Sequence, residues 1–152
     1  MRDLAELRRT HIGRYLFELE KAYSDITVPF IQNKGFSEFT RGQLQVLGLL
    51  HLNKPTPMKE LIEKSDLSKQ AVSRMVGVCE KNKFVKRVTS ETDARAWDII
   101  FTDKGKKLMR TAGDAILFAE KAFEDQLGKR TFNELKSLLA KAATELVHIE
   151  VD

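Results

Sequence analysis

Apolar residues recur at intervals of three and four positions over much of the chain, which is the spacing of amphipathic helices. The first such stretch runs from Leu4 to Ile26, and we expect Pro29 to end or bend this helix. Thr40 and Gln43 form the pattern of a capping box, which marks the start of a second helix. The face that this second helix is expected to bury consists of Leu44, Val46, Leu47 and Leu50.

Two longer helices are predicted in the C-terminal part of the chain. Thr102 can cap a helix from about Asp103 to Gln126, and Gly128 breaks it. Thr131 and Glu134 then form a second capping-box pattern at the start of a final helix. The apolar face of that final helix consists of Phe132, Leu135, Leu138, Leu139, Ala142, Leu146 and Ile149.

Two shorter helices are expected in the middle of the chain. Thr56 reads as a cap and Pro57 as a first helical residue, so Met58 to Lys64 is predicted to be helical. After a tight turn, Ser68 caps a helix from Lys69 to about Lys81. Its predicted inward stripe consists of Ala71, Val72, Met75, Val76 and Cys79. Its predicted outward stripe consists of Lys69, Gln70, Ser73, Arg74 and Gly77.

Beyond residue 83 the apolar period changes from 3.6 to 2, which indicates strands. Phe84 to Thr89 and Ala96 to Thr102 are rich in β-branched and aromatic residues, and they bracket a polar tip at residues 90–95. One face of the second strand is expected to carry Trp97, Ile99 and Phe101. The pattern as a whole predicts a mainly α fold with a small β-hairpin.

Composition narrows the class of protein. A chain of 152 residues with 42% hydrophobic and 32% charged residues is typical of one globular domain with a sizeable core. The single Cys79 excludes a disulfide framework and any zinc site that needs two thiolates. No apolar run approaches the roughly 20 residues of a membrane span, and the mixed charge of the first residues is unlike an export signal. We therefore expect a cytoplasmic protein.

The net charge of +4 is unevenly distributed. The segment from Lys54 to Lys107 has 13 Lys and Arg against 8 Asp and Glu, whereas the rest of the chain is close to neutral. A basic segment between neutral arms is typical of a nucleic-acid contact surface on a neutral scaffold. A solvated basic face would have the same charge pattern.

Residues 58–81 have the pattern of a helix-turn-helix, in which the second helix enters the DNA major groove. Gln70, Ser73 and Arg74 are side chains that pair with base edges, whereas Lys69 is expected to meet a phosphate and Ser68 begins the helix. An ordinary amphipathic helix pair shows the same pattern. The hairpin that follows makes the combination a winged helix, in which Arg95 can reach the neighbouring minor groove. Asp93 is suited to holding an arginine or capping the turn.

Four segments of the sequence, taken in order, resemble the MarR family of winged-helix regulators. They are Leu67 to Val76, the basic end of the first strand, the wing segment Asp93–Ala94–Arg95, and Phe101–Thr102–Asp103–Lys104–Gly105. The resemblance implies a homodimer on a pseudo-palindromic operator, usually a repressor released by a ligand. It makes Arg95 the wing arginine and Asp93 its partner. Ala94 stands where many members have another arginine, and Phe101 replaces the usual Leu.

The domain boundaries follow from this resemblance. Residues 1–152 are expected to form a single MarR-type domain. Residues 1–32 and 104–152 would make a helical dimerisation lobe. Residues 38–103 would make the winged helix-turn-helix lobe, with its motif at 58–81 and its wing at 84–102. The apolar side chains expected to interlock with a second chain are Leu4, Leu7, Phe132, Leu135, Leu139, Leu146 and Ile149.

The family has a cleft for small, often aromatic anions between its two lobes. By position, His11, Arg14, Tyr15 and Arg41 are the candidates for lining such a cleft here, although each also fits a surface or interface role. The family's thiol-sensing branch uses a cysteine near the N-terminus, which this sequence lacks. Cys79 lies on the inward stripe and is expected to be a buried structural thiol.

The sequence shows no catalytic set. His11, His51 and His148 lie on different predicted helices, and there is no glycine-rich phosphate loop, HExxH motif or paired-carboxylate signature. We expect no enzyme activity, no cofactor and no metal. The expected partners are double-stranded DNA, a second copy of the chain and a small-molecule effector. A winged-helix protein-interaction module that does not bind DNA is the competing interpretation.

Overall fold

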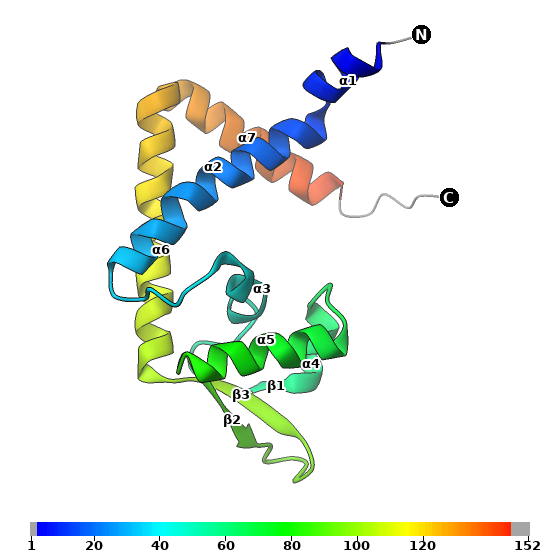
Figure 1. Ribbon diagram of the computed structural model, residues 1–152, viewed down its shortest axis with the longest axis vertical. Coiled ribbons are helices and arrows are strands. Elements are labelled where there is room, and N and C mark those ends of the chain that lie inside the picture. The colour runs from blue at the N-terminus through cyan, green and yellow to red at the C-terminus, as the bar shows by residue number, and fades with distance from the viewer. Residues whose placement is uncertain (1–2, 147–152) are drawn as a thin grey trace. The chain divides into compact units, whose positions relative to one another are not determined.

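The computed structural model describes residues 3–146, which form helices and one small three-stranded antiparallel sheet (Figure 1). The chain divides into two compact units, one ending at Ala115 and the other beginning at Ile116. The first unit holds the sheet and the two short central helices. The second unit holds the end of one long helix and the helix that follows it. This composition agrees with the predicted mainly α fold with a small wing.

The N-terminal stretch forms two helices, α1 (Leu4–Thr10) and α2 (Ile12–Asn33), rather than the single helix predicted. His11 has an extended backbone, and its Nδ1 accepts a hydrogen bond from the backbone N–H of Arg14 at 3.2 Å, which begins α2. Pro29 lies inside α2 and does not end it. The helix continues because Ile31, 2% exposed, is anchored in the core beyond the proline.

The second predicted helix is a short 3₁₀ turn, η1 (Arg41–Gln43), followed by α3 (Leu44–Leu47). The predicted capping box is confirmed, and the backbone N–H of Thr40 donates to Gln43 Oε1 at 2.8 Å. Val46 and Leu47 are buried as expected, but Leu44 is exposed, contrary to the prediction. A 3₁₀ turn has three residues per turn, which rotates the inward face away from that expected for an α-helix.

The prediction for Thr56 and Pro57 is wrong. The two residues form strand β1 (Thr56–Pro57), which pairs with β3 (Trp97–Phe101), rather than capping a helix. The Thr56 hydroxyl accepts a hydrogen bond from the backbone N–H of His51 at 2.8 Å, so it supports the preceding loop instead. The next helix, α4 (Met58–Lys64), has the predicted bounds and begins without a side-chain cap.

The remaining central elements match the predictions closely. Helix α5 (Lys69–Lys81) has the predicted bounds, and β2 (Val85–Thr89) pairs with β3 in the strand order β1-β3-β2. On the predicted face of β3, Ile99 and Phe101 are buried, whereas Trp97 is 50% exposed. The core beneath α5 and the sheet includes Leu61, Val72, Val76, Cys79, Phe84, Ile99, Phe101 and Leu108.

Helix α6 (Asp103–Leu127) begins at the predicted cap, because the Thr102 hydroxyl accepts from the backbone N–H of Gly105 at 3.0 Å. Helix α7 (Lys129–Glu145) does not begin at the predicted capping box. Its N-cap is Gly128, whose positive φ of 79° suits glycine. Glu134 instead accepts from the Arg130 side chain at 2.9 Å, one helical turn away.

Much of the predicted apolar face of α7 is exposed in the single chain. Leu138, Leu139 and Leu146 are 66%, 40% and 55% exposed, whereas Phe132 is buried. The predictions for Ile149 and His148 lie outside the described residues. In α1, Leu4 and Leu7 are likewise exposed, at 68% and 43%. These apolar surfaces are therefore unburied within the described chain.

Candidate nucleic-acid interface

Helix α5 presents a row of polar side chains to solvent. Ser68 caps it by accepting a hydrogen bond from the backbone N–H of Ala71 at 3.2 Å. Val72, Val76 and Cys79 turn the opposite stripe of the helix into the core, at 0% exposure. Burial of that stripe sets the rotation of the helix. Of the predicted outward stripe, Lys69, Gln70, Ser73 and Arg74 are exposed, whereas Gly77 is half-buried; the cap Ser68 is exposed beside them.

The charged and amide side chains of this row are free to take a partner. Within residues 3–146, the side chains of Lys69, Gln70 and Arg74 make no hydrogen bond or ion pair. Exposed donors on a helix braced by a second helix have the geometry that major-groove reading requires. The structure thus brings together the five predicted α5 residues on one open surface.

The wing tip is held by a backbone turn. Asp93 Oδ1 accepts from the backbone N–H of Arg95 at 2.9 Å, and the Asp93 carbonyl oxygen accepts from the backbone N–H of Ala96 at 2.9 Å. Of the two roles predicted for Asp93, the structure shows the cap of the turn; its carboxylate makes no ion pair with the Arg95 side chain. The Arg95 guanidinium is exposed at the tip and has no partner among the residues that the structure describes.

Polar contacts among Glu80, Arg87 and Ser73, called the Arg87–Glu80 clip below, join the wing to α5, and the sequence did not predict them. Glu80 Oε1 accepts from the backbone N–H of Arg87 at 3.2 Å, and the Arg87 side chain lies 3.7 Å from Glu80 Oε2. The Arg87 guanidinium also donates to the carbonyl oxygen of Ser73 at 3.3 Å. Since Ser73 is on α5 and Arg87 is on β2, this clip fixes the two elements relative to each other. The basic end of the first strand was a sequence signal, but its partners were not.

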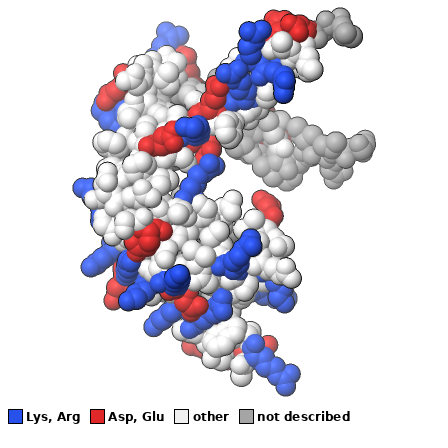
Figure 2. All heavy atoms as spheres, in the orientation of Figure 1, with Lys and Arg blue, Asp and Glu red and all other residues white. Residues whose placement is uncertain are grey.

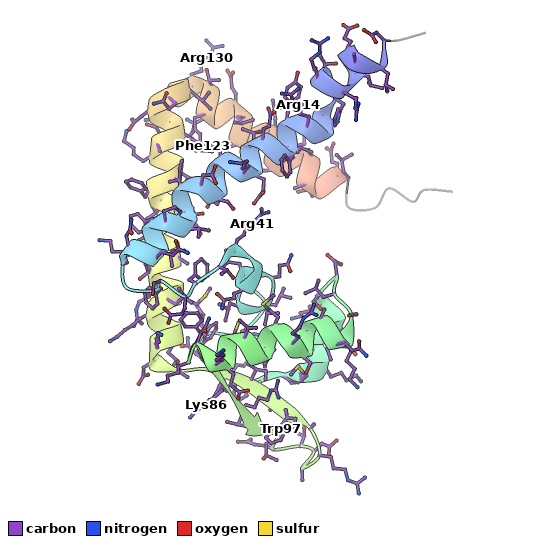
Figure 3. The ribbon with its side chains drawn as sticks, viewed as in Figure 1. Arg14, Arg41, Lys86, Trp97, Phe123 and Arg130 are labelled. Atoms are coloured by element: carbon purple, nitrogen blue, oxygen red, sulfur yellow. The ribbon has the colours of Figure 1, made fainter. Side chains whose placement is uncertain are left out.

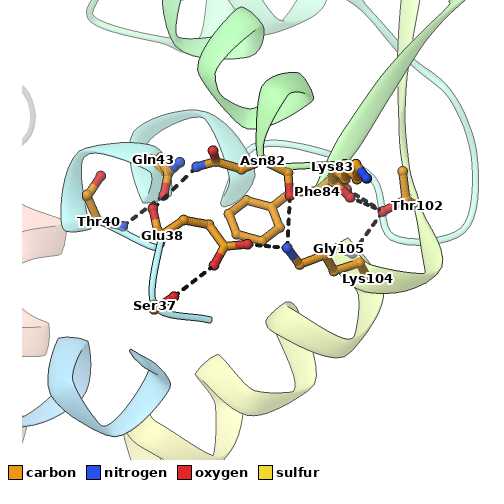
Figure 4. A network of polar contacts seen from close by, with 10 residues as sticks. All are labelled: Ser37, Glu38, Thr40, Gln43, Asn82, Lys83, Phe84, Thr102, Lys104 and Gly105. Atoms are coloured by element: carbon orange, nitrogen blue, oxygen red, sulfur yellow. Dashed lines mark hydrogen bonds and ion pairs between the residues drawn. The ribbon is translucent and has the colours of Figure 1, made fainter. Parts of the chain in front are cut away.

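A second network braces the C-terminal end of α5 (Figure 4). Lys104 forms an ion pair with Glu38 and donates to the carbonyl oxygen of Asn82 at 3.1 Å. Its ammonium group lies 5.1 Å from the centre of the Phe84 ring. The hydrogen bond from Lys104 is the main reason that the pKa of the Glu38 carboxyl is lowered. This network ties the end of α5 to the start of α6.

Cationic side chains gather on this part of the molecule. Figure 2 shows Lys and Arg over α5 and a cationic side chain projecting at the tip of the wing, with only a few acidic groups between them. Among the carboxylates of α4 and α5, Glu80 is paired with Arg87 and Glu60 with Lys64. The surface that remains available is therefore mainly positive.

Of the four candidate ligand residues, His11 directly precedes α2, Arg14 and Tyr15 lie on α2, and Arg41 begins η1; Figure 3 labels Arg14 and Arg41. His11 caps α2, and Arg14 pairs with Glu18 at 2.8 Å. Arg41 pairs with Glu20 of α2, and Tyr15 is 48% exposed. The role of these residues in binding a ligand stays a prediction.

Between residues 3 and 146, no helix is both long and apolar enough to cross a membrane. The same part of the chain holds no group of three or more His, Cys, Asp and Glu side chains arranged to bind a metal ion.

Comparison with known proteins gives one match in sequence, which lies in the central part of the chain. The model of the MarR family matches residues 37–96. No curated protein matches the chain in sequence. The structure of the transcriptional repressor CouR bound to a 23-mer DNA duplex is 22% identical, with a TM-score of 0.72, and the match covers 94% of this chain and 99% of CouR.

Two structures of MarR from E. coli are also similar. A cysteine-to-serine mutant of that protein complexed with operator DNA is 17% identical, with a TM-score of 0.72, over 92% of this chain and 98% of that one. The reduced form of the protein is 16% identical, with a TM-score of 0.73, over 88% and 96% of the two chains. At these identities the likeness shows a shared fold.

Proposed function

We propose that this chain is a sequence-specific, double-stranded DNA-binding transcriptional regulator, and the match of the MarR family model to residues 37–96 supports this proposal. The observation that carries the proposal is the row of exposed polar side chains on α5. Among the described residues, Lys69, Gln70 and Arg74 are unpaired on a helix clipped to a wing whose tip presents an unpaired Arg95. In support, CouR and the MarR mutant, which share this fold, were determined with bound DNA.

Each side chain of the surface has a role in this proposal. Arg74 and Gln70 read base edges in the major groove, because Arg pairs with guanine and Gln with adenine through two hydrogen bonds each. Ser73 pairs with a base edge beside them, whereas Lys69 contacts a phosphate and Ser68 lies with it at the DNA-contacting start of the helix. Arg95 enters the adjacent minor groove, where a narrow A·T-rich stretch concentrates negative potential.

The active form in this proposal is a homodimer on a pseudo-palindromic operator. A single winged helix buries only about 600–1,000 Å² on DNA, whereas two copies double that contact. The exposed apolar side chains of α1 and α7 support self-association, since Leu7 is 43% exposed and Leu138 is 66% exposed. We expect the half-sites to lie one or two helical turns apart.

The regulatory outcome in this proposal is repression that a small aromatic or anionic ligand relieves. The support is the description of CouR as a repressor and the two arginines of the candidate ligand set. Arg14 and Arg41 each pair with an exposed or half-exposed carboxylate, with which an anionic ligand would compete. Release of labelled duplex on addition of small aromatic carboxylates tests this part, and the Arg41→Ala variant should lose the response.

The test of the function is selection of bound duplexes from a random DNA pool by the purified protein. We expect an enriched sequence with two-fold symmetry. On that sequence, Arg74→Ala should weaken binding by about 1–3 kcal/mol and relax the preference at one base position. Lys59→Ala is the matched control, because Lys59 is 86% exposed on α4 and lies outside the proposed surface.

The salt dependence of binding separates this function from a protein-interaction module. Phosphate contacts release counterions, so the logarithm of the duplex affinity should fall steeply and linearly with the logarithm of the salt concentration. An unchanged binding profile for Arg74→Ala would remove that residue from the reading set. Recovery of no sequence from the pool, and no duplex binding in dilute buffer, would contradict the function itself.

A further inference from the structure

Trp97 is the single tryptophan of the chain, and its side chain is half exposed at the end of the β2–β3 ladder that is next to the wing tip. In the described part of the chain, nothing accepts a hydrogen bond from its indole N–H, and no aromatic ring stacks on it. An indole combines a large apolar surface with one donor, so tryptophans usually bury the ring and pair the N–H. Here both features are available to a partner.

The strand register determines which way Trp97 faces. Side chains alternate along β3, so Trp97 shares a face with Ile99, which is buried against the core. Arg87 is paired with Ile99 across the ladder, and its guanidinium reaches the carbonyl oxygen of Ser73 on α5 at 3.3 Å. Trp97 therefore lies on the α5 side of the wing, at the outer end of that face (Figure 3).

This position lies between the two elements assigned to different grooves. If α5 enters the major groove and the wing tip enters the next minor groove, the phosphodiester strand that separates them must pass the surface between α5 and the tip. Half or more of protein–DNA hydrogen bonds go to phosphate and sugar, and neutral donors supply many of them. Trp97 offers such a donor at that place, together with an apolar ring.

We propose that Trp97 anchors the DNA backbone between the two grooves, with its indole N–H donating to a phosphate oxygen and its ring packed on a deoxyribose. This inference rests on the proposed function and adds a contact to it. Trp97 would then determine how deeply the wing and α5 enter their grooves, and it would contact no base.

The charges around Trp97 favour a polyanion as its partner. Within residues 3–146, Arg74 and Arg95 are unpaired on the two sides of this surface. Glu80 of α5 is paired with Arg87, Asp93 caps the turn at the tip, and Glu91 is the remaining exposed carboxylate of the tip. A second copy of the chain or another protein is the alternative occupant that the test below must distinguish.

The intrinsic fluorescence of the unmodified protein tests the proposal, because its emission comes from Trp97 with only 2 Tyr residues besides. Titration with the duplex selected from the random pool should quench or shift the emission and protect it from iodide. The change should saturate at the same duplex concentration as the anisotropy of a labelled copy. Duplex binding with unchanged emission and iodide quenching would overturn the inference while leaving the function standing.

Two other outcomes are informative. Protection of Trp97 from iodide as the protein concentration rises, without DNA, would overturn the inference in favour of self-association. Failure of any duplex to raise the anisotropy would overturn the proposed function and, with it, this inference. The fluorescence and anisotropy signals together therefore separate the two failures.

Variants supply a second readout. Trp97→Phe keeps a ring and loses the donor, whereas Trp97→Ala loses both, so the affinity should fall about tenfold and about a hundredfold respectively. The loss should be equal on operator and unrelated duplexes, and the salt slope should not change, because the indole is uncharged. Leu52→Ala is the control, since Leu52 is 53% exposed outside this surface. Wild-type affinity for Trp97→Ala would overturn the inference.

Discussion

Arg95 differs from the other cations of the wing in its position at the tip, and its guanidinium has no partner within the described chain. Asp93 holds the backbone of the turn, not the guanidinium, so the side chain is free to enter a groove. The negative potential of a narrow A·T-rich minor groove attracts an inserted arginine more strongly than that of a wider groove. The position of Arg95 therefore predicts a preference for flanking sequence.

Arg95→Ala should weaken binding most on operators with A·T-rich flanks. The measurement is anisotropy on two duplexes that share half-sites and differ only in the flanks. Lys141→Ala, which removes an exposed lysine of α7, is the control and should bind both duplexes like the wild type. Equal losses for Arg95→Ala on both duplexes would contradict minor-groove insertion.

Cys79, unlike Arg95, is fully buried, and burial makes its thiol less reactive. The side chain is 0% exposed within the α5 core, and desolvation raises the pKa of its thiol from 9.0 to about 11. The thiolate is the reactive form, so this placement fits a structural thiol and not a redox sensor.

The raised pKa predicts a loss of stability at high pH. Below pH 9 the thiol is protonated in both states, and its contribution is fully present. Between pH 9 and about 11 the unfolded thiol ionises first, so the free energy of unfolding should fall by up to about 1.4 kcal/mol per pH unit from this group. Urea unfolding of the wild type and of Cys79→Ala across this range measures it. Parallel pH curves for the two proteins would show that the thiol does not contribute.

At the scale of elements, the predictions succeeded where local sequence determines the structure. The bounds of α5 were predicted because the Ser68 cap and the apolar stripe from Val72 to Cys79 both lie within the helix. Strand β1 was missed because so short a strand carries no period, and its partner on β3 is far along the chain. The break at His11 was missed because the apolar stripe continues through it without glycine or proline at that position.

The same distinction applies to the candidate site. The exposed residues of α5 and the tip of the wing could be predicted from spacing alone. The Arg87–Glu80 clip and the Glu38–Lys104 ion pair could not, because each joins elements that only the folded chain brings together. These contacts hold α5 in place, so they belong to the candidate site although their side chains are not part of its exposed surface.

The junction between the wing and α6 depends on Gly105. A Cβ there would overlap the carbonyl oxygen of Phe84 and lie 2.8 Å from Cδ1 of Phe101. Gly105→Ala should therefore displace the start of α6 from the wing base and destabilise the fold by about 2–4 kcal/mol. Thermal or urea unfolding measures the loss.

Gly113 supplies the matched control in the same helix. A Cβ there meets nothing within 4 Å, so Gly113→Ala should stabilise the protein by about 0.5–1 kcal/mol through helix propensity. A Gly105→Ala protein as stable as the Gly113→Ala protein would contradict the close packing at the junction.

For the whole molecule, the exposed apolar surface predicts self-association. In sedimentation at micromolar concentration, we expect a species of twice the 17.4 kDa chain mass. Leu139→Glu, which places a charge at a position 40% exposed on α7, should shift the protein toward the monomer. Leu52→Glu, outside the terminal helices, should leave the dimer intact. A wild-type protein that sediments only at 17.4 kDa would rule out the dimer.

The central claim is that α5 and the wing together bind successive grooves of a DNA duplex. The most direct measurement is selection from a random duplex pool with the purified wild-type chain in dilute buffer, without an added ligand. We expect enrichment of a two-fold symmetric sequence whose binding weakens steeply with salt. Recovery of no preferred sequence, with no retention of duplex at the lowest salt, would contradict it.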